Sequence, residues 1–405
     1  MMIATSAPGA FHIMAKPSGS ACNLHCDYCF FLKKRSLYPG SNFRMTDEVH
    51  KTFIRQLLQY HRGPGVTVAW QGGEPALMGL GFSRRSLELQ KRYRGPGVRI
   101  ENTFQTNGVL LDDQWCRFFY ENNFLVGLSL DGPNELHDFY RKDKAGRGTF
   151  RRVEHAARLL QKHRVEFNIL CAVNSKNGDH PLEVYRFFRD KLGVNFIQFI
   201  PVVERANQTG YQQGGAVTER SVGPEQFGRF LIEIFDEWVA LDVGRTFVLN
   251  FDAALAGWLG RPGPVCIFAP TCGLALALEH NGDLYSCDHF VEPACLLGNI
   301  LETHMIELVV SAGQQKFGRD KRDTLPGCRG RCDFLAVCYG ECPKNRFVET
   351  TDKEKGLNYL CAGYKAFFLH ATSAMKIMAR LIRGGKTAGG VMQILPEATN
   401  ERSGN

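Results

Sequence analysis

The feature that most constrains this chain of 405 residues is its cysteine content, because the 14 cysteines are clustered rather than spread evenly. Three of them stand close together near the N-terminus, and nine lie between Cys266 and Cys361. No run of about 18 apolar residues predicts a membrane helix, and no basic segment followed by an apolar stretch predicts a secretory signal. We therefore expect a cytoplasmic protein, in which clustered cysteines indicate metal or redox ligands rather than disulfides.

The composition is that of a globular protein. Hydrophobic residues make up 44% of the chain and charged residues 22%, which excludes disordered, collagen-like and coiled-coil chains. The length predicts two or three domains. The net charge of +8 comes from basic residues scattered along the chain, so we expect no nucleic-acid partner, while acidic peptides or small anions remain open as partners.

The first 200 residues alternate between strand-like and helix-like segments. Apolar runs predict strands at Phe11–Ala15, Val66–Trp70, Val98–Phe104, Phe124–Leu130, Val165–Val173 and Asn195–Ile200. Helical spacing predicts helices at Asp47–Tyr60, Arg84–Arg94, Asp112–Asn122, Phe150–His163 and Pro181–Lys191. Such alternation predicts an α/β fold in which a parallel sheet curls into a full or partial barrel, with functional residues at the carboxyl ends of its strands.

The remainder of the chain has a different character. A polar, Gly-rich stretch at 204–223 predicts a loop between domains, and Pro224–Leu241 has a strong amphipathic helical pattern. Apolar periodicity then fades where cysteines become dense, which predicts a segment organised by metal. These observations predict a barrel at 1–223, a linking helical region at 224–260, a cysteine-rich domain with a C-terminal helix at 261–383, and a flexible tail at 384–405.

The N-terminal cysteines Cys22, Cys26 and Cys29 form a C-x3-C-x2-C motif directly after the first predicted strand. Three thiolates can hold one face of a [4Fe–4S] cluster and leave its fourth iron open to a substrate or cofactor. A structural zinc ion is normally closed by four protein ligands, and His25 is the neighbour that could complete such a site.

This motif, with Tyr28 before its last cysteine, resembles the radical SAM superfamily. The resemblance implies a partial (β/α)6 radical SAM barrel whose open iron binds S-adenosyl-L-methionine through its amino and carboxylate groups. It also implies that reductive cleavage of this cofactor releases a 5′-deoxyadenosyl radical, which takes hydrogen from unactivated carbon.

Further segments match this superfamily at successive strand ends. The GGEP segment at 72–75 implies that the backbone at Gly73 and the Glu74 carboxylate meet the methionine amino group. The SLDG segment implies that Ser129 holds the methionine carboxylate together with Arg141, whose planar, always charged guanidinium suits this role. The segment ending at Val203 implies a backbone contact with adenine. Each piece alone would be an ordinary loop of a parallel sheet.

A second group of eight cysteines resembles the SPASM extension of peptide-modifying radical SAM enzymes, a cysteine-rich domain with auxiliary iron–sulfur clusters. In that arrangement auxiliary cluster I takes Cys266, Cys272, Cys287 and Cys342, and auxiliary cluster II takes Cys328, Cys332, Cys338 and Cys361. The spacing from Cys328 to Cys332 is one residue longer than in that family, which makes the ligands of cluster II less secure. The alternative is a pair of zinc sites.

Asp288 directly follows Cys287, so a carboxylate beside a cluster ligand could accept a proton while the cluster accepts an electron. Its plainer interpretation is a solvated loop carboxylate. The pattern up to about residue 380 resembles the anaerobic sulfatase-maturating enzymes, and the Cys-Asp pair is its most specific element. The resemblance implies oxidation of a Cys or Ser side chain in a sulfatase to Cα-formylglycine by hydrogen abstraction from Cβ, with Asp288 as general base and three [4Fe–4S] clusters.

The resemblance also implies two kinds of protein partner: a sulfatase segment that carries the target residue, and an electron donor such as flavodoxin or ferredoxin. Two other functions stay open. One is a different SPASM peptide maturase that forms thioether or carbon–carbon crosslinks. The other is a non-catalytic zinc or iron–sulfur protein that binds a partner or carries electrons.

Overall fold

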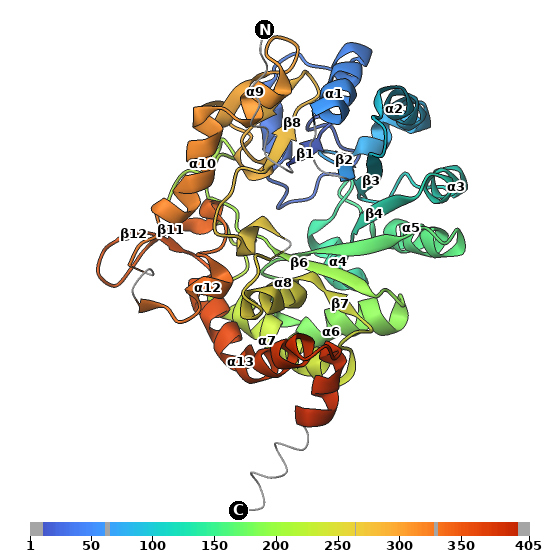
Figure 1. The fold of residues 1–405 in the computed structure, drawn as a ribbon. Helices are drawn as coiled ribbons and strands as arrows, with labels where there is room; N and C mark the ends of the chain where they lie inside the picture. Colours follow the sequence, from blue (N-terminus) through green and yellow to red (C-terminus); the bar gives the residue numbers. More distant parts are fainter. Residues whose placement is uncertain (1–10, 61–64, 264, 328–330, 396–405) are drawn as a thin grey trace, which may run out of the picture.

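The computed structural model describes residues 11–60, 65–263, 265–327 and 331–395. Within them one twisted sheet has the strand order β10-β9-β8-β1-β2-β3-β4-β5-β6-β7, and it curves around the centre of the molecule (Figure 1). The parallel part consists of β1 (His12–Ala15), β2 (Gly65–Trp70), β3 (Arg99–Thr106), β4 (Phe124–Ser129), β5 (Phe167–Val173), β6 (Phe196–Pro201) and β7 (Phe247–Val248). The six strands expected from the sequence are all present, with ends shifted by one or two residues.

Helices cover the outer face of the parallel strands (Figure 1). They are α1 (Asp47–Tyr60), α2 (Gly79–Tyr93), α3 (Asp113–Glu121), α4 (Asn134–Tyr140), α5 (Phe150–Lys162), α6 (Pro181–Arg186) with a π-turn at Phe187–Lys191, and α7 (Pro224–Leu241). The bounds of α1 and α7 agree with the sequence expectation. Local signals explain the start of α1, because the Thr46 hydroxyl accepts a hydrogen bond from the Val49 N–H at 3.3 Å.

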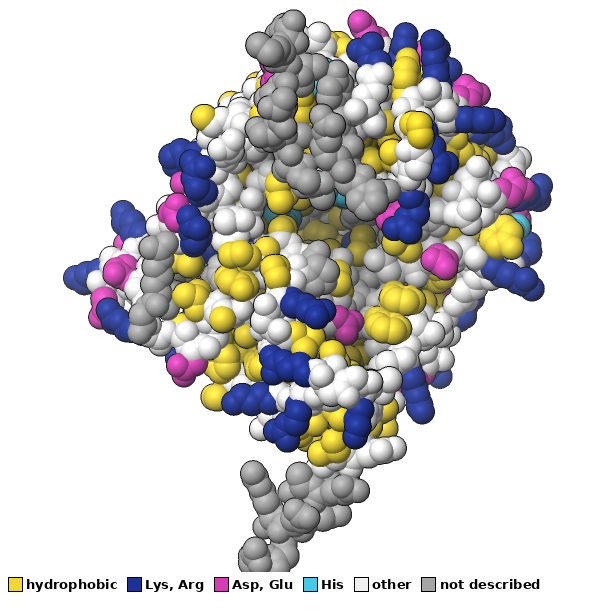
Figure 2. Space-filling model, in the orientation of Figure 1, with side chains coloured by type: hydrophobic (Ala, Val, Ile, Leu, Met, Phe, Trp, Pro, Cys, Tyr) yellow, Lys and Arg dark blue, Asp and Glu magenta, His cyan; other side chains and the backbone are white. Residues whose placement is uncertain are grey.

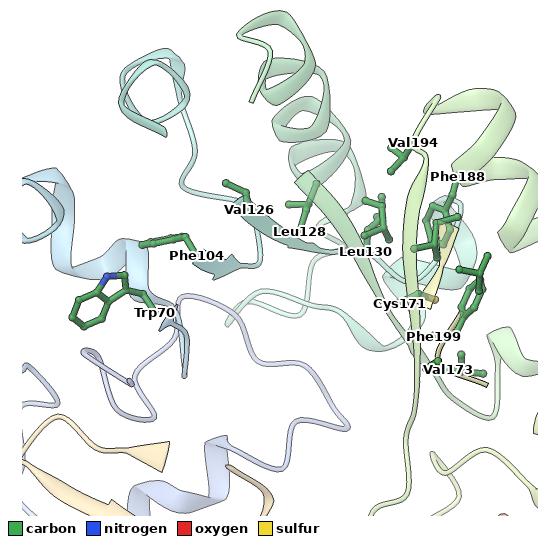
Figure 3. Close-up of a cluster of buried hydrophobic side chains, with 14 of the residues drawn as sticks. Trp70, Phe104, Val126, Leu128, Leu130, Cys171, Val173, Phe188, Val194 and Phe199 are labelled. Carbon is green, nitrogen blue, oxygen red and sulfur yellow. The ribbon is translucent and has the colours of Figure 1, made fainter. Parts of the chain in front are cut away.

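The core lies between the sheet and these helices. Figure 3 shows side chains from neighbouring strands, including Trp70, Phe104 and Val126, directed toward one packed layer. Cys171 in β5 and Cys116 in α3 are fully buried within this core, where both act as small hydrophobic residues.

The cysteine-rich part of the chain extends the same sheet. Its strands are β8 (Ala275–Leu278), β9 (Asp283–Tyr285) and β10 (Leu296–Asn299), and β8 pairs in parallel with β1. The remaining elements are α8 (Leu249–Trp258), α9 (Met305–Val309), α10 (Ala312–Asp323), α12 (Leu335–Cys338), a hairpin of β11 (Arg346–Glu349) with β12 (Lys355–Asn358), and α13 (Cys361–Arg383). The segment with fading apolar periodicity is thus joined directly to the first strand of the barrel.

The C-terminal helix α13 packs against α7. A Cβ atom on Gly228 would lie 2.7 Å from the Cα of Gly363, so only glycines allow this approach. The segment 384–395, expected to be a flexible tail, instead packs on the protein, with Val391 fully buried; residues 396–405 lie outside the described part. The domain boundaries proposed from the sequence stay a prediction.

The visible surface mixes charges of both signs. Figure 2 shows Lys and Arg side chains distributed with Asp and Glu over this face of the molecule. In the described ranges, no helix is both long enough and apolar enough to cross a membrane.

Candidate active site

Cys22, Cys26 and Cys29 lie in the loop that follows β1, and all three are free thiols. The backbone N–H of Leu24 and the side-chain amide of Asn107 point at the Cys22 sulfur, at 3.4 and 3.6 Å. Burial raises the pKa values of Cys22 and Cys26 to about 12. These thiols therefore stay protonated until a positively charged centre binds, as expected for ligands that lose protons to a metal cluster.

The structure does not bring His25 together with the N-terminal cysteines as a zinc site would require. The His25 side chain, the neighbour that could complete a zinc site, is exposed to solvent. Across the part of the chain that the structure covers, no three His, Cys, Asp or Glu side chains converge as the ligands of a single metal ion do, and this holds for the cysteines assigned to each cluster as well.

The two glycines after β2 bring the chain into close contact with the cysteine loop. The N–H of Gly73 donates to the Gly19 carbonyl at 2.8 Å, and a Cβ atom at Gly73 would lie only 2.0 Å from the Ala21 carbonyl oxygen. The hydroxyls of Ser18 and Ser20 and the Gln71 amide nitrogen are buried without hydrogen-bond partners among the described residues. Such unsatisfied polar atoms on adjoining loops fit a site for a polar cofactor.

Glu74 is fully buried, and its carboxylate is already engaged by the protein. One oxygen accepts hydrogen bonds from the Ala76 N–H at 2.9 Å and the Thr106 hydroxyl at 2.8 Å, and the other accepts from the Asn107 N–H at 2.8 Å. Burial raises the pKa of Glu74 to about 7, while these donors act to lower it. Glu74 thus holds two strand-end loops together through these hydrogen bonds, and its expected contact with the methionine amino group stays a prediction.

Arg141 and Tyr28 meet at Asp131, a residue that was not among the candidates from the sequence. The Asp131 carboxylate accepts hydrogen bonds from Arg141 Nε at 2.8 Å, from the Ala172 N–H at 2.9 Å and from the Tyr28 hydroxyl. In the described residues no hydrogen bond occupies the two terminal nitrogens of Arg141, which leaves them available to a carboxylate ligand. Ser129 lies at the end of β4, next to this group.

A cavity of about 130 Å³ connects the barrel to the cysteine-rich part. Tyr28 and Phe30 of the N-terminal loop line it, together with Val203 after β6. His289 and Lys344, on the other side, come from the segments that follow Cys287 and Cys342. The expected contacts at Tyr28 and Val203 therefore belong to the same space, which reaches the residue beside Asp288.

Asp288 forms an ion pair with Lys16, the first residue after β1. The Lys16 side chain is 3% exposed and the Asp288 side chain 20% exposed, and the Lys16 ammonium lies 4.2 Å from the centre of the Phe31 ring. Burial acts to raise the pKa of Asp288, but the charge and hydrogen bond of Lys16, together with the effects of His289 and Lys344, outweigh burial, and the pKa lies below its usual value. Asp288 is thus a charged carboxylate rather than a freely solvated one.

His289, the neighbour of Asp288, has a different protonation state. Burial lowers its pKa to about 3, and its Nδ1 atom is buried without a partner in the described structure. It lies 5.7 Å from the Phe30 ring, centre to centre. A neutral imidazole at this position can exchange hydrogen bonds with a ligand in the cavity.

The four cysteines assigned to auxiliary cluster I come from separate segments. Cys266 and Cys272 precede β8, Cys287 follows β9, and Cys342 follows α12. Burial raises the pKa of Cys287, and the negative charges of nearby Asp288, Cys266 and Cys272 add to the rise. Burial likewise raises the pKa of Cys342, with Cys287 among the contributing charges. These mutual effects place the four thiols in one neighbourhood.

The cysteines assigned to auxiliary cluster II share a cavity of about 30 Å³ near the β11–β12 hairpin. Cys332, Cys338 and Cys361 all line it, with Tyr364 and Phe368 beneath them. The Gly340 N–H donates to the Cys338 sulfur at 3.2 Å. Cys328 lies outside the described residues, so the effect of the longer spacing to Cys332 stays open. The three described thiols suit a shared cluster, since they surround one space without forming disulfides.

The sequence reasoning missed Lys16 and Asp131 as members of the site. A signal existed for Asp131, which lies in the SLDG segment, whereas Lys16 precedes the N-terminal cysteines and belongs to none of the motifs described above. Their partners could not be read from the motifs, because Lys16 and Asp288 are 272 positions apart.

Comparison with known proteins agrees with this geometry. The family model of the radical SAM superfamily matches residues 17–188, and SPASM, an iron–sulfur cluster-binding domain, matches residues 266–333. A serine-type anaerobic sulfatase-maturating enzyme of Bacteroides thetaiotaomicron is 44% identical, over 98% of this chain and 99% of its own. A cysteine-type anaerobic sulfatase-maturating enzyme of Clostridium perfringens is 37% identical, over 89% of this chain and 95% of its own.

A solved structure is similar over nearly the same extent. It is described as native anSMEcpe with bound AdoMet and Cp18Cys peptide, and it has 35% sequence identity and a TM-score of 0.82. The similarity covers 92% of this chain and 99% of that one.

Proposed function

This chain belongs to the anaerobic sulfatase-maturating enzymes of the radical SAM superfamily, and from that premise we propose that it oxidises a Cys or Ser side chain of a sulfatase polypeptide to Cα-formylglycine. It is a radical SAM oxidoreductase, and its cofactors are S-adenosylmethionine and three [4Fe–4S] clusters. A flavodoxin or ferredoxin would supply the electron that starts each turnover.

The residues after β1 and at the following strand ends would hold these cofactors. We assign Cys22, Cys26 and Cys29 to the cluster with the open iron, because the three free thiols share one loop with N–H donors directed at sulfur. When bound and reduced, the cofactors supply a 5′-deoxyadenosyl radical that removes hydrogen from carbon. The auxiliary clusters would take the two sets of four cysteines named above.

For the methionine part of the cofactor, the free terminal nitrogens of Arg141 would bind the carboxylate, with Ser129 beside them. The Asp131 carboxylate accepts a hydrogen bond from Arg141 Nε and so fixes the plane of the Arg141 guanidinium. The backbone at Gly73 would meet the amino group, whereas Glu74 keeps the surrounding loops in place through its three hydrogen bonds. The backbone at Val203 would meet adenine. In these roles the chain orients a charged ligand with buried, pre-positioned groups.

Asp288 would take the proton from the thiol or hydroxyl of the substrate. Its carboxylate is kept charged by Lys16, and a charged carboxylate at a partly buried position is able to accept a proton from a substrate group. A hydroxyl is much less acidic than a thiol, so a Ser substrate depends on this base more strongly than a Cys substrate.

The observation that carries the proposal is a cavity that residues of the barrel and of the cysteine-rich part line together. Its lining includes Tyr28 of the N-terminal motif and His289, the residue next to Asp288. A peptide side chain that enters this space can lie between the groups that bind S-adenosylmethionine and the proposed base. This placement satisfies the main requirement of the reaction, which is short-range positioning of the reacting carbon.

The test uses the anaerobically reconstituted full chain with S-adenosylmethionine and a strong reductant. Two sulfatase-motif peptides that differ only in a Cys or Ser at the target position are incubated with it, and mass spectrometry follows the aldehyde product. The matched control is the chain in which Cys22, Cys26 and Cys29 are all replaced by Ala. Aldehyde formation by the natural chain alone supports the proposal. Production of 5′-deoxyadenosine with crosslinked peptide and no aldehyde would instead identify a different peptide maturase.

A further inference from the structure

Helix α10 (Ala312–Asp323) buries a polar face against the loops that carry the cysteines of auxiliary cluster I. Gln314, Gly318 and Lys321 lie four and then three positions apart, which places them on one side of the helix. All three are buried. A helix face of this kind is costly to bury unless each polar group finds a partner, so the contacts of these residues indicate what the face is for.

Together these residues contact the segments that carry Cys266, Cys272 and Cys287. The Gln314 side-chain amide donates to the carbonyls of Gly273 and Ser286, at 2.9 and 3.1 Å. The Gly318 carbonyl accepts the Cys272 N–H at 3.0 Å, and a Cβ atom on Gly318 would lie only 2.7 Å from the Cys272 carbonyl oxygen. Helix α10 thus approaches the cluster ligands as closely as a backbone can.

Lys321 brings a positive charge into this contact. Its residue is 0% exposed, and its ammonium donates to the carbonyls of Cys266 and Ile267, at 2.6 and 2.9 Å. Within the described ranges no carboxylate forms an ion pair with Lys321, whereas the more exposed Lys316 and Arg322 of the same helix do pair with carboxylates. A buried ammonium that has only carbonyl partners is unfavourable unless negative charge lies close by.

Auxiliary cluster I, which the four assigned cysteines would hold, is the source of that negative charge, because a [4Fe–4S] cluster bound by four thiolates carries a net negative charge. The Lys321 ammonium contacts the backbone of Cys266, one assigned ligand, and Gly318 of the same helix contacts the backbone of Cys272, a second one. The buried ammonium therefore lies beside two of the four assigned ligands.

Two other buried charges lie in the same region. The Arg346 guanidinium donates to the carbonyls of Lys321, Tyr339 and Gly340, and the Glu341 carboxylate accepts hydrogen bonds from Asn345 and Asn358. These two charges have opposite signs, and Lys321 adds a further positive charge in this region.

We propose that Lys321 is a positioning residue that acts through auxiliary cluster I: its buried charge raises the reduction potential of that cluster, so that the cluster accepts the electron released by the substrate. The inference rests on the proposed function, since it concerns the step after hydrogen abstraction. In that step the substrate carbon radical loses one electron, the oxidised cluster gains it, and the thiol or hydroxyl proton passes to Asp288. A nearby positive charge favours the more negative, reduced state of the cluster.

The test is an anaerobic redox titration of the reconstituted enzyme, followed by electron paramagnetic resonance without peptide or S-adenosylmethionine. In Lys321→Met, one cluster should show a reduced-to-oxidised ratio about tenfold lower at a given potential, which corresponds to about 59 mV for one electron. Lys321→Arg keeps the charge and should keep the potential. Lys316→Met is the matched control, because Lys316 lies on the same helix but is exposed and paired with Asp320 at 2.6 Å.

Lys321→Gln is a second neutral variant that retains a donor for the Cys266 carbonyl, and it should show the same shift. Full iron content with unchanged potentials in both neutral variants would overturn the proposal. Loss of a cluster in both neutral variants would also overturn it, because Lys321 would then be needed only for assembly. No peptide is present in the titration, so the measured reduction potential does not depend on formylglycine formation. A failure of the proposed function and a failure of the role of Lys321 are therefore seen in different experiments.

Discussion

Replacing Asp288 by Asn should affect both the stability of the protein and the rate of the proposed reaction, and the two effects can be measured separately. The first is on stability, because the change leaves the Lys16 ammonium, with a side chain only 3% exposed, without its partner. Removing one member of a buried pair costs about 3–5 kcal/mol. Asp288 keeps 20% of its side chain exposed, so solvent offsets part of the cost, and we expect a loss of about 2–4 kcal/mol.

The double variant Lys16→Met with Asp288→Asn should regain most of this stability. Met removes the stranded charge, and its apolar side chain can pack where the Lys16 stem lies, between the Phe31 ring and Gly72. Replacing a buried ion pair by packed apolar groups is often neutral or stabilising. Anaerobic urea unfolding of the reconstituted proteins, followed by tryptophan fluorescence, measures the difference because Trp70 and Trp238 are buried.

The second effect is on the reaction, and it should not recover. Loss of a general base typically costs about 10²–10⁴-fold in rate, so formylglycine should stay low in both the single and the double variant. The Ser peptide should be affected more than the Cys peptide, while 5′-deoxyadenosine is still formed. If the double variant makes aldehyde at the natural rate, Asp288 is not the base and His289 becomes the next candidate. If Asp288→Asn unfolds like the natural chain, the pair with Lys16 contributes nothing to stability.

Three further outcomes are expected. The reconstituted chain should hold about twelve irons in three four-iron clusters. The chain with Cys22, Cys26 and Cys29 replaced by Ala should keep about eight irons and release no 5′-deoxyadenosine. Continued release of 5′-deoxyadenosine would show that this motif does not bind the reactive cluster. Chelation of iron should expose 261–363 to protease before the barrel, because cluster ligation holds its loops, and mass spectrometry of the first fragments checks this. Burial lowers the pKa of His137 to about 3. The unfolded chain therefore binds a proton at this residue below about pH 6.5, whereas the folded protein does not, and the free energy of unfolding should fall by about 2 kcal/mol from pH 7 to pH 5. Urea unfolding at the two pH values measures this loss, which should be smaller in His137→Gln.

Helices whose buried face is apolar were predictable from the sequence, whereas α10 was not. The bounds of α1 and α7 agree with the predicted ranges, because each buries an apolar stripe of helical period against the sheet. Helix α10 buries Gln314, Gly318 and Lys321 instead, so its contact face has no hydrophobic pattern. Its position follows from hydrogen bonds to cysteine loops that are distant in sequence.

The candidate site likewise contains residues that the sequence predicted and contacts that only the structure shows. The motif resemblance brought out Tyr28, Arg141 and Asp288. In the structure Tyr28 lines the cavity, Arg141 shares the Asp131 carboxylate with Tyr28, and Asp288 precedes the lining residue His289. The motif did not indicate the three donors that engage the Glu74 carboxylate, and its contact with the methionine amino group stays a prediction. A motif indicates that a carboxylate belongs at a site, but its hydrogen-bond partners decide which way the carboxylate faces.

The first six strands of the barrel, most of its helices, the clustering of cysteines and the family were all predictable from the sequence, whereas α4 and β7 were not. The predictable features depend on local period and spacing, which neighbouring residues carry. Only the tertiary structure decided that β8 pairs with β1 and that Lys16 thereby reaches Asp288, 272 positions away. The pairing of distant strands depends on shape and burial that form only when the whole sheet is assembled, and this is why the contact between the two halves of the site has no signature in either segment alone.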